Sequence, residues 1–546
     1  ANNSGNSTLI NSTEGVLYVE IKALNENGGN RYISLSNGTD LNRILLRFQD
    51  TDKVGCYVRS TSGYDAQIDK TSASISSNFL KVAVKWKTND VALWVNGVQI
   101  GVDSSFTTFN ANVLDRLNLT GTNGTSQYFY GKNKALAVYK EALTDANLRS
   151  LTYPNPVATT FDLDFDTIAE QFTFTRGSEA TFVNAQGLIE STASNDAPRI
   201  DYSTGAKAFL LEPQSTNLIP YSEDFSQSAW FKSNSLITSN SVISPDGTLN
   251  ADKLIENTSN ASHQVYDAVI TASGNFSNSI FVKAAERSKI RISSGSNSHK
   301  VDFDLSNGSI ILEVGATGSI DSMANGWYKC DISWNTVTVS AQYFLISLLD
   351  DFGTQSYQGD GTSGVYIWGA QVEAQSYATS YIPTSGATAT RNQELCNNAT
   401  PVINSEEGTL YAEISALAND GTLRMVNIND GTQNNRVGIQ YSSTTNLITA
   451  AYDISGAGQA TLNYTLSDAN SFNKIAFKFA LNDFSLFVNG VKVATDTSGN
   501  VLSPNTLNNI DFDYGDNRFH FFGNTKGLKV YPKALADVQL EDLTTI

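Results

Sequence analysis

The two ends of this chain repeat each other. Residues 14–21 read EGVLYVEI and residues 407–414 read EGTLYAEI, at an offset of 393 residues. At the same offset, residues 90–98 (DVALWVNGV) match residues 483–491 (DFSLFVNGV). Because these blocks recur in the same order, we expect the first and last stretches of about 150 residues to be copies of one fold.

The repeated blocks have the pattern of β-strands. Leu17, Val19 and Ile21 alternate with Tyr18 and Glu20, which is the period of a strand with one buried face. Residues 93–100 hold Asn-Gly between two apolar runs, the strongest short signal for a hairpin. Helices are expected only near residues 144–148 and 536–543, where an amphipathic pattern follows the last strand of each copy.

The composition agrees with a chain made of strands. Only 16% of the 546 residues are charged, against about 25% in an average soluble protein. Ser, Thr, Asn and Gly take their place, and these residues favour turns and exposed strand faces over helix interiors. The length is too great for one core and predicts about three domains. We therefore expect an all-β chain of several modules.

The charge balance and the cysteines limit the class of partner. Lys and Arg number 36 against 54 Asp and Glu, a formal net charge of −18. An acidic surface repels phosphate backbones and anionic lipids, so we expect neither nucleic acid nor a membrane as partner. Cys56, Cys330 and Cys396 are an odd number spread over separate modules, which is not a disulfide framework.

Between the two copies the sequence changes its pattern twice. Residues 153–218 contain short apolar runs between turns, which predicts a connector of short hairpins packed against its neighbours. Residues 219–390 contain regular short strands with polar turns, the pattern of a jelly-roll sandwich. The expected order is a sandwich over residues 1–152, the connector, the jelly roll, and a second sandwich over residues 391–546.

The hairpin and the closing motifs of the two copies carry a family resemblance. The hairpin is strand-Val-Asn-Gly-strand, and the close contains FYG and AVY at residues 129–131 and 137–139. This combination resembles the laminin-G-like members of the concanavalin-A-like lectin superfamily and implies two β-sandwiches. It leaves the ligand open, because such modules bind sugars, bind proteins or are merely structural.

Four stretches of the middle region carry a second resemblance. They are RGSEAT (residues 176–181), LEPQSTNL (211–218), VYIWGAQVE (365–373) and YIPT (381–384). These stretches resemble the connectors and carbohydrate-binding-module jelly rolls of bacteriophage appendage and other virion proteins. The resemblance implies a tail or head fibre or a spike on the virion exterior. Such a protein would bind host-surface glycans multivalently, contact other virion proteins and form a homo-oligomer, with a trimer favoured.

Two other classes of protein remain open from the sequence. One is a purely architectural protein that decorates a capsid or acts as an adaptor between virion proteins. The other is a secreted bacterial adhesin at the cell surface. Asn2 and Asn3 resemble Asn397 and Asn398, which follow the connector. We therefore expect the gene product to continue upstream of Ala1, with another jelly roll as one form of that extension.

A search for catalytic motifs predicts that the chain is not an enzyme. It contains no Gly-x-Ser-x-Gly elbow, no Walker loop and no His-Glu-x-x-His. The three histidines, His263, His299 and His520, lie in different sequence contexts. We expect no required cofactor.

The acidic stretch of residues 162–166 is the closest match to the paired carboxylates of the glucanases in the lectin-like superfamily, but its spacing to Glu170 is wrong for catalysis. Two other interpretations remain. Alternation places Asp162, Asp164 and Asp166 on one face of a strand, with Leu163 and Phe165 on the other. We favour a solvated edge that discourages edge-to-edge pairing of sheets. The alternative is a calcium contact through these three carboxylates.

Three aromatic residues are candidates for stacking on a sugar. Trp94 and its counterpart Phe487 alternate with apolar residues and face either a concave sheet surface or the sandwich core. Trp327 follows Asn325-Gly326, so it is the best candidate for an exposed ring, although burial in the core is the interpretation that we favour.

A loop motif recurs in both copies. Asn42-Arg43 and Asn435-Arg436 each follow a glycine-containing turn. Loops at the ends of sandwiches are the usual places for ligand binding, which makes these four residues binding candidates. The alternative is local, with Asn capping the turn and Arg beginning the strand.

Overall fold

A computed structural model describes residues 5–24, 30–49, 53–61, 63–71, 79–121, 127–153, 157–295 and 298–546. Asn2 and Asn3, on which the expected upstream extension partly rests, lie outside these residues. The chain forms two compact units, residues 1–156 and residues 157–546. Strands dominate both units, which confirms the all-β fold class. Among the described residues, no helix has the length and apolar character needed to cross a membrane.

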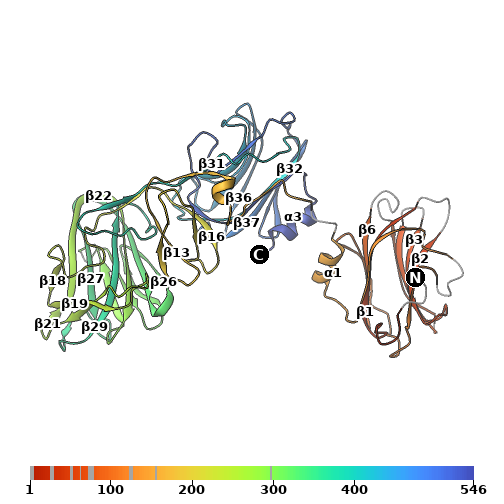
Figure 1. Cartoon of the computed structure of the whole chain (residues 1–546), viewed down its shortest axis with the longest axis horizontal. Coiled ribbons are helices and arrows are strands. Elements are labelled where there is room, and N and C mark those ends of the chain that lie inside the picture. Colours follow the sequence, from red (N-terminus) through yellow and green to blue (C-terminus); the bar gives the residue numbers. More distant parts are fainter. Residues whose placement is uncertain are drawn as a thin grey trace. The chain divides into compact units, whose positions relative to one another are not determined.

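The first unit is a sandwich of two five-stranded antiparallel sheets (Figure 1). One sheet has the order β10-β1-β6-β7-β8 and the other has the order β5-β4-β3-β2-β9. Their apolar inner faces meet in one core that includes Leu17, Ile44 and Trp86. The strands are β1 Gly15–Ala23, β2 Arg31–Ser36, β3 Arg43–Gln49, β4 Lys53–Ser60, β5 Gly63–Thr71, β6 Leu80–Trp86, β7 Val91–Val95, β8 Val98–Asp103, β9 Arg116–Asn118 and β10 Gly131–Tyr139.

The predicted Asn-Gly hairpin and the predicted helix are both present in this unit. Asn96 and Gly97 join β7 to β8 with φ of 48° and 80°, the left-handed pair that a tight hairpin turn needs. Helix α1 (Asp145–Thr152) follows β10. Leu148 of this helix belongs to a second apolar cluster on the outer face of the β1 sheet. One outer face of the sandwich is therefore covered.

The second sandwich repeats this plan within residues 157–546. One sheet contains β41-β32-β37-β38-β39 and the other has the order β36-β35-β34-β33-β40, so the strands of the repeat pair in the same order as in the first copy. Helix α3 (Asp537–Thr544) follows the last strand, as predicted. The strands are β32 Gly408–Ala416, β33 Arg424–Asn429, β34 Arg436–Tyr441, β35 Leu447–Ile454, β36 Ala457–Thr465, β37 Asn473–Ala480, β38 Asp483–Val488, β39 Val491–Asp496, β40 Asn509–Asp511 and β41 Gly523–Tyr531.

The connector is joined to this second sandwich by backbone pairing. Strands β11 (Phe161–Asp162) and β16 (Ala208–Leu211) both pair with β41, and β15 (Arg199–Asp201) pairs with β16. The sheet thus grows to eight strands. The remaining connector elements are α2 Ile168–Gln171, β12 Thr173–Thr175 paired with β31 Leu395–Asn397, the hairpin of β13 Thr181–Val183 and β14 Ile189–Ser191, and β17 Ser215–Asn217 paired with β30 Ala389–Arg391. The expected boundaries after residues 218 and 390, which divide the connector, the jelly roll and the second sandwich, stay a prediction.

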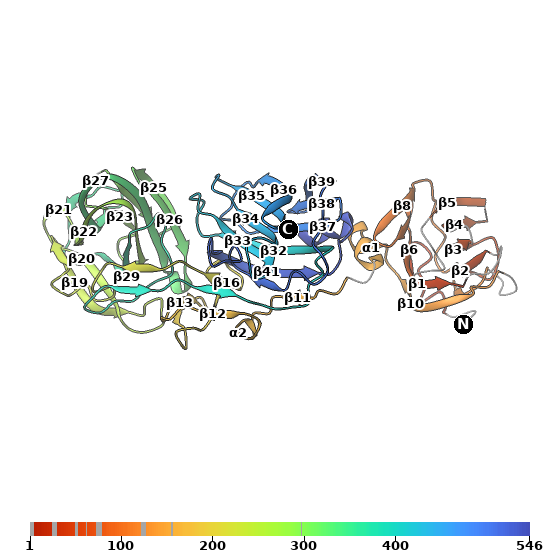
Figure 2. The ribbon, with the colours of Figure 1, turned by 90° about the horizontal axis from the view of Figure 1, so that it is seen from above.

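The middle module is built on two long strands, β22 (Gln264–Ala284) and β27 (Tyr328–Leu349). The hydrogen-bonded order is β19-β20-β29-β22-β27-β23-β24-β25. In Figure 2, β19, β20 and β29 lie on one side of the module and β23 and β25 on the other, around a shared apolar core. The other elements are β18 Phe231–Ser233, β19 Ser235–Val242, β20 Ala251–Glu256, β21 Asn260–Ser262, β23 Lys289–Ser293, β24 Lys300–Asp304, β25 Ser309–Val314, β26 Thr317–Ser322, η1 Ala324–Gly326, β28 Ser356–Gln358 and β29 Gly364–Glu373.

Candidate functional site

The aromatic residues of the repeated hairpins lie under the closing helices. Trp94 is 6% exposed and packs in the cluster that contains Leu148 of α1. Phe487 is fully buried in the matching cluster with Leu540 of α3. Each ring points to the outer face of its sheet, as alternation allows, but a helix covers that face. Neither ring is open to a ligand in this structure.

Trp327, the candidate for an exposed ring, is buried, which is the interpretation that the sequence favoured. Its side chain is 1% exposed and packs against Phe281, Trp368 and Tyr381. Its indole Nε1 donates a hydrogen bond to the carbonyl oxygen of Ile243 at 3.1 Å. The Asn-Gly turn directs the ring inward, because the one-turn helix η1 ends there and the chain enters β27 directly afterwards.

The other outer face of the first sandwich carries aromatic and charged side chains. Strands β3, β4 and β5 alternate between residues of the core and residues that point away from it. The outward residues on these strands include a group that we call the tyrosine–arginine face, with Arg43 at its rim: Arg47, Tyr57, Arg59, Tyr64, Gln67 and Asp69.

Asp69 organises the polar part of this face. Its Oδ1 accepts a hydrogen bond from Arg47 Nη2 at 2.7 Å. Its Oδ2 accepts from the Tyr57 hydroxyl at 3.1 Å and from Gln67 Nε2 at 3.0 Å. Burial raises the pKa of Tyr57 to about 12, and the Asp69 carboxylate adds to the rise against the opposing effect of Arg47. The Tyr57 hydroxyl therefore stays protonated and remains a donor near neutral pH.

The two tyrosine rings form the apolar part of the face. Their centroids lie 5.8 Å apart, and the ring planes are inclined at 60°. The Arg47 guanidinium lies over the Tyr57 ring at 4.7 Å, and the Arg59 guanidinium lies over the Tyr64 ring at 5.1 Å. Tyr64 is 61% exposed. A ring held in this way offers a stiff contact surface at little entropic cost, with hydrogen-bond donors at its edge.

The second sandwich has none of these side chains at the equivalent positions. Strand register gives the equivalences, because Leu45 pairs with Tyr57 as Gly438 pairs with Ala451. The neighbouring pairs extend this correspondence to the next strand. In the order Arg47, Tyr57, Arg59, Tyr64, Gln67 and Asp69, the equivalent residues are Gln440, Ala451, Asp453, Gly458, Thr461 and Asn463.

The loop candidates of the first copy lie at the rim of the tyrosine–arginine face. Arg43 begins β3 and is the Cα partner of Arg59. Its Nη1 lies 3.0 Å from Asp40 Oδ1. The carbonyl oxygen of Asn42 accepts a hydrogen bond from the Asn37 amide at 3.3 Å, which closes the turn. Arg43 is thus next to the tyrosine–arginine face. The hydrogen bond of Asn42 closes its own turn, which agrees with the interpretation of Asn42 as a turn residue.

The loop candidates of the second copy are engaged with other residues. Arg436 Nη2 lies 2.6 Å from Asp453 Oδ2, and its guanidinium stacks 3.7 Å from the Tyr514 ring. Asn435 Nδ2 donates to Asp430 Oδ2 at 2.7 Å, and its Oδ1 accepts from the Ser455 amide. These contacts tie two turns of the sandwich together.

The acidic stretch of the connector lies at a sheet edge. Strand β11 ends at Asp162, and the alternation continues beyond it, with Asp164 exposed and Leu163 buried. Asp162 Oδ2 lies 2.9 Å from Lys529 Nζ, and Asp164 Oδ1 accepts from the Asp166 amide at 3.0 Å. Within the part of the chain that the structure describes, no group of three His, Cys, Asp or Glu side chains is placed to hold a metal ion.

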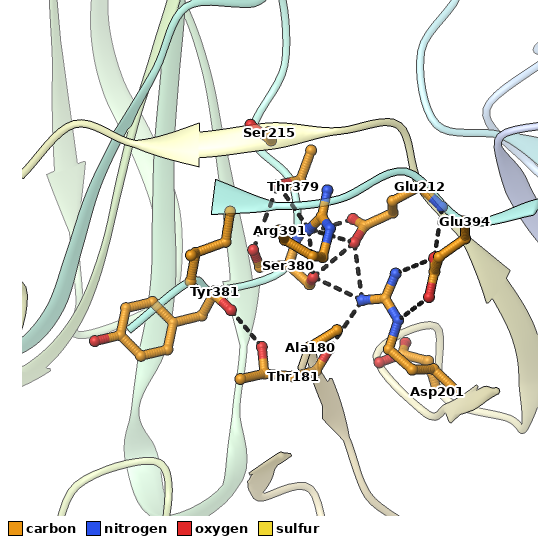
Figure 3. A network of polar contacts seen from close by, with 12 residues as sticks. Ala180, Thr181, Asp201, Glu212, Ser215, Thr379, Ser380, Tyr381, Arg391 and Glu394 are labelled. Carbon is orange, nitrogen blue, oxygen red and sulfur yellow. Dashed lines mark hydrogen bonds and ion pairs between the residues drawn. The ribbon is translucent and has the colours of Figure 1, made fainter. Parts of the chain in front are cut away.

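Sequence reasoning missed a buried ionic network around the connector (Figure 3). Arg199 Nε donates to Glu394 Oε1 at 2.8 Å, and its Nη1 lies 2.9 Å from Glu212 Oε2. Arg391 pairs with Glu212 at 2.7 Å, and Arg176 pairs with Glu394 at 2.8 Å. All five side chains are at most 3% exposed.

The lowered pKa of Glu212 shows that the arginines of the network keep this buried carboxylate ionised. Burial alone would raise its pKa, but Arg391 and Arg199 bring the pKa down to about 2. Because these charges are paired and buried, the network joins distant chain segments. The signal in the sequence was indirect, since Arg176 and Glu212 stand in the RGSEAT and LEPQSTNL stretches.

Comparison with known proteins supports the class of fold. Residues 9–149 match the model of a family described as the concanavalin A-like lectin/glucanases superfamily, Laminin_G_3. The first unit is therefore a concanavalin A-like, laminin-G-type sandwich, and the second sandwich repeats its strand order. A search of the curated proteins found no match.

Several solved structures match this chain at low identity and with low TM-scores. The CBM40 module of the Ruminococcus gnavus IT-sialidase, bound to α2,3-sialyllactose, is 22% identical with a TM-score of 0.25, over 28% of this chain and 94% of that chain. The K499G mutant of the NanB sialidase from Streptococcus pneumoniae is 11% identical with a TM-score of 0.24, over 92% and 82%. A leech intramolecular trans-sialidase is 14% identical with a TM-score of 0.25, over 92% and 80%.

Proposed function

We propose that this chain is a lectin-like appendage protein of a bacteriophage particle that binds host-surface glycans through the tyrosine–arginine face. One observation carries the proposal. Tyr64 presents a ring that is 61% exposed beside Tyr57, and the Arg47–Asp69 pair fixes the polar groups around it.

The chemistry of this face suits a sugar ring. The C–H face of a pyranose packs on an exposed aromatic ring, which provides apolar contact without a deep pocket. Hydroxyl groups of the sugar then meet donors and acceptors at the edge of the ring, here Gln67, Asp69 and Arg59. A shallow site of this kind binds weakly, so several copies are needed for firm attachment.

The assignment to a virion rests on the resemblance of the connector and the jelly roll to phage appendage proteins. In this proposal the protein is on the outside of the particle, contacts other virion proteins and forms a homo-oligomer, with a trimer favoured. Each added protomer brings another tyrosine–arginine face to the same host surface. The gain in avidity comes from effective concentration and needs no new contact.

The proposal assigns binding without catalysis. Glycosidases of most families use two carboxyl groups on either side of the scissile bond. The six residues of the tyrosine–arginine face include one carboxylate, Asp69, and Arg47, Tyr57 and Gln67 already bond to it. This carboxylate holds its three neighbours in place.

The test is a glycan array with the full-length chain and single variants. We expect Tyr64→Ala and Tyr57→Ala to lower binding at least tenfold, because each removes part of the stacking surface. Tyr464→Ala is the matched control, since Tyr464 lies on β36, the strand equivalent to β5, and is 37% exposed. Unchanged binding in both face variants would contradict the proposed site. No binding by a confirmed oligomer would favour the architectural role.

A further inference from the structure

Two arginines lie opposite each other at one end of the tyrosine–arginine face. Arg43 on β3 and Arg59 on β4 are Cα partners in adjacent antiparallel strands. Like charges in directly opposed positions are destabilising in a sheet unless something neutralises them. The arrangement therefore needs an anionic partner.

Only one of these two arginines has a carboxylate partner in the described part of the chain. Arg43 Nη1 lies 3.0 Å from Asp40 Oδ1. Among these residues, the side chain of Arg59 makes no ion pair and no hydrogen bond. Its guanidinium stacks over the Tyr64 ring, 5.1 Å from the ring centroid. Its Nε is buried without a hydrogen-bond partner.

Neither Asp65 nor Asp69, the carboxylates nearest in sequence and register among the described residues, forms an ion pair with Arg59. Asp69 binds Arg47, Tyr57 and Gln67. Asp65 Oδ2 accepts a hydrogen bond from the Ser60 amide at 2.6 Å. The guanidinium of Arg59 is thus held against the most exposed ring of the face with its charge unpaired, although the chain as a whole carries a net charge of −18.

The second sandwich shows how the same position is neutralised within the chain. The residue equivalent to Arg59 is Asp453, and it pairs with Arg436, the counterpart of Arg43, at 2.6 Å. One copy of the fold thus completes this ion pair internally. The other copy places a second arginine where the carboxylate would be.

Building on the proposed function, we infer that the tyrosine–arginine face selects glycans that carry a carboxylate. The sugar ring lies on Tyr64, and its carboxylate pairs with Arg59, the charge for which the described part of the first sandwich supplies no partner. A guanidinium matches a planar carboxylate with two parallel N–H···O bonds. Neutral sugars have no carboxylate to pair with Arg59.

The test compares matched oligosaccharides on the full-length chain by titration calorimetry. One oligosaccharide contains a uronic acid, and the other is the same molecule with the carboxyl group reduced to an alcohol. We expect the acidic form to bind at least tenfold more tightly, with a preference that shrinks as salt rises because exposed charges are screened. Sulfated and phosphorylated analogues, measured in the same way, are expected to bind more weakly than the uronate.

Variants at Arg59 decide the role of this residue. Arg59→Gln is expected to remove the preference for the acidic form, and Arg59→Asp, which introduces the residue of the second sandwich, is expected to reverse it. Arg116→Gln is the control, because Arg116 begins β9 at the opposite edge of the same sheet and pairs with Asp115. Its preference is expected to equal that of the unaltered chain.

The outcomes separate this inference from the proposed function. Equal binding of the acidic and reduced forms, with both lost in Tyr64→Ala, would overturn the selection for carboxylates and leave glycan binding in place. A preference that persists in Arg59→Gln would overturn the role of Arg59. Tighter binding of a sulfated or phosphorylated analogue than of the uronate would overturn the selection for carboxylates. No binding of any form would overturn both.

Discussion

The two sandwiches are copies of one fold that have been used in different ways. In the first copy, strands β3, β4 and β5 present Tyr57, Tyr64 and arginines on an open face. In the second copy, the equivalent positions carry small or neutral residues and the Arg436–Asp453 pair. The shared core residues maintain the fold, whereas the outward residues have diverged. What a sandwich of this type can bind is therefore decided by the residues that its core does not constrain.

The two copies also differ in how they are built into the chain. The first sandwich forms a compact unit of its own, residues 1–156. The second shares its sheet with connector strands β11, β15 and β16 and is fastened to the connector through Glu394. The second copy is therefore part of a larger packed unit, whereas the first is not.

The largest expected effect comes from breaking the buried network. Arg199→Met leaves Glu394 and Glu212 each with one cation fewer in a sealed site, and we expect a loss of about 3–5 kcal/mol in the free energy of unfolding of residues 157–546. Differential scanning calorimetry measures it. Lys253→Met, which removes a half-exposed pair with Glu286, is the control and is expected to cost less than about 1 kcal/mol. A shift in the unfolding of residues 1–156 would contradict the division into two units.

The next effect tests whether the repeated hairpin aromatics are structural in both copies. Trp94→Ala and Phe487→Ala are each expected to cost about 3 kcal/mol, because each leaves a cavity beneath a closing helix. Chemical denaturation measures the loss. Glycan binding per folded molecule is expected to stay unchanged in Phe487→Ala. A loss of binding without a loss of stability in Trp94→Ala would restore the ligand-stacking interpretation.

A smaller effect concerns a buried carboxylate that only the second copy has. Burial raises the pKa of Asp513 to about 6, and Asp511 adds to the rise; strand register places Thr120 at the equivalent position in the first copy. Because the pKa is higher in the folded than in the unfolded state, the folded state binds more protons between about pH 4 and 6. This group therefore stabilises residues 157–546 by about 1 kcal/mol more at pH 5 than at pH 7.5.

The melting temperature of Asp513→Asn at these two pH values checks this prediction. The variant is expected to lose the part of the pH response that Asp513 supplies. Asp252, whose pKa burial also raises to about 6, still contributes in both proteins. His520, whose pKa burial lowers, acts in the opposite direction in both. An identical pH response in the variant would show that Asp513 titrates at its ordinary pKa.

The smallest expected effect is at the acidic edge of the connector. Asp162→Asn removes a solvent-exposed pair with Lys529, and we expect a change of less than about 1 kcal/mol in the unfolding of residues 157–546. Added calcium is expected to leave the melting temperature unchanged in the unaltered chain and in the variant. A rise with calcium that disappears in Asp162→Asn would support the calcium contact instead.

The features that could be predicted from the sequence are those with a local cause. The Asn96-Gly97 turn, the strand alternation around Leu17 and the helices after each last strand follow from residues near one another in the chain. Because the sequence blocks repeat, the fold expected for one copy could also be expected for the other. The alternation in residues 56–59 and 64–69 also held the signal for the tyrosine–arginine face, because Tyr57, Arg59, Tyr64 and Asp69 point away from the core.

The rest depended on contacts between distant segments. Alternation shows that Trp94 points to one side of its sheet, but it does not show that α1 covers that side. The buried network joins Arg176 and Arg199 to Glu394, about 200 residues further along the chain, and no local pattern pairs them. Trp327 follows a turn that is typical of an exposed position, and only the packing of Phe281 and Tyr381 around it shows that it is buried.

Hydroxyl-radical footprinting of the full-length chain, with and without the glycan that binds best on the array, tests the difference between the two copies most directly. We expect the glycan to protect the side chain of Tyr64 from oxidation, with Tyr57 protected less because it is already partly buried. The side chains of residues 449–463 on the equivalent face of the second sandwich are expected to react equally in both samples. Unchanged oxidation of Tyr64, or protection confined to the second sandwich, would contradict the assignment of ligand binding to the first copy.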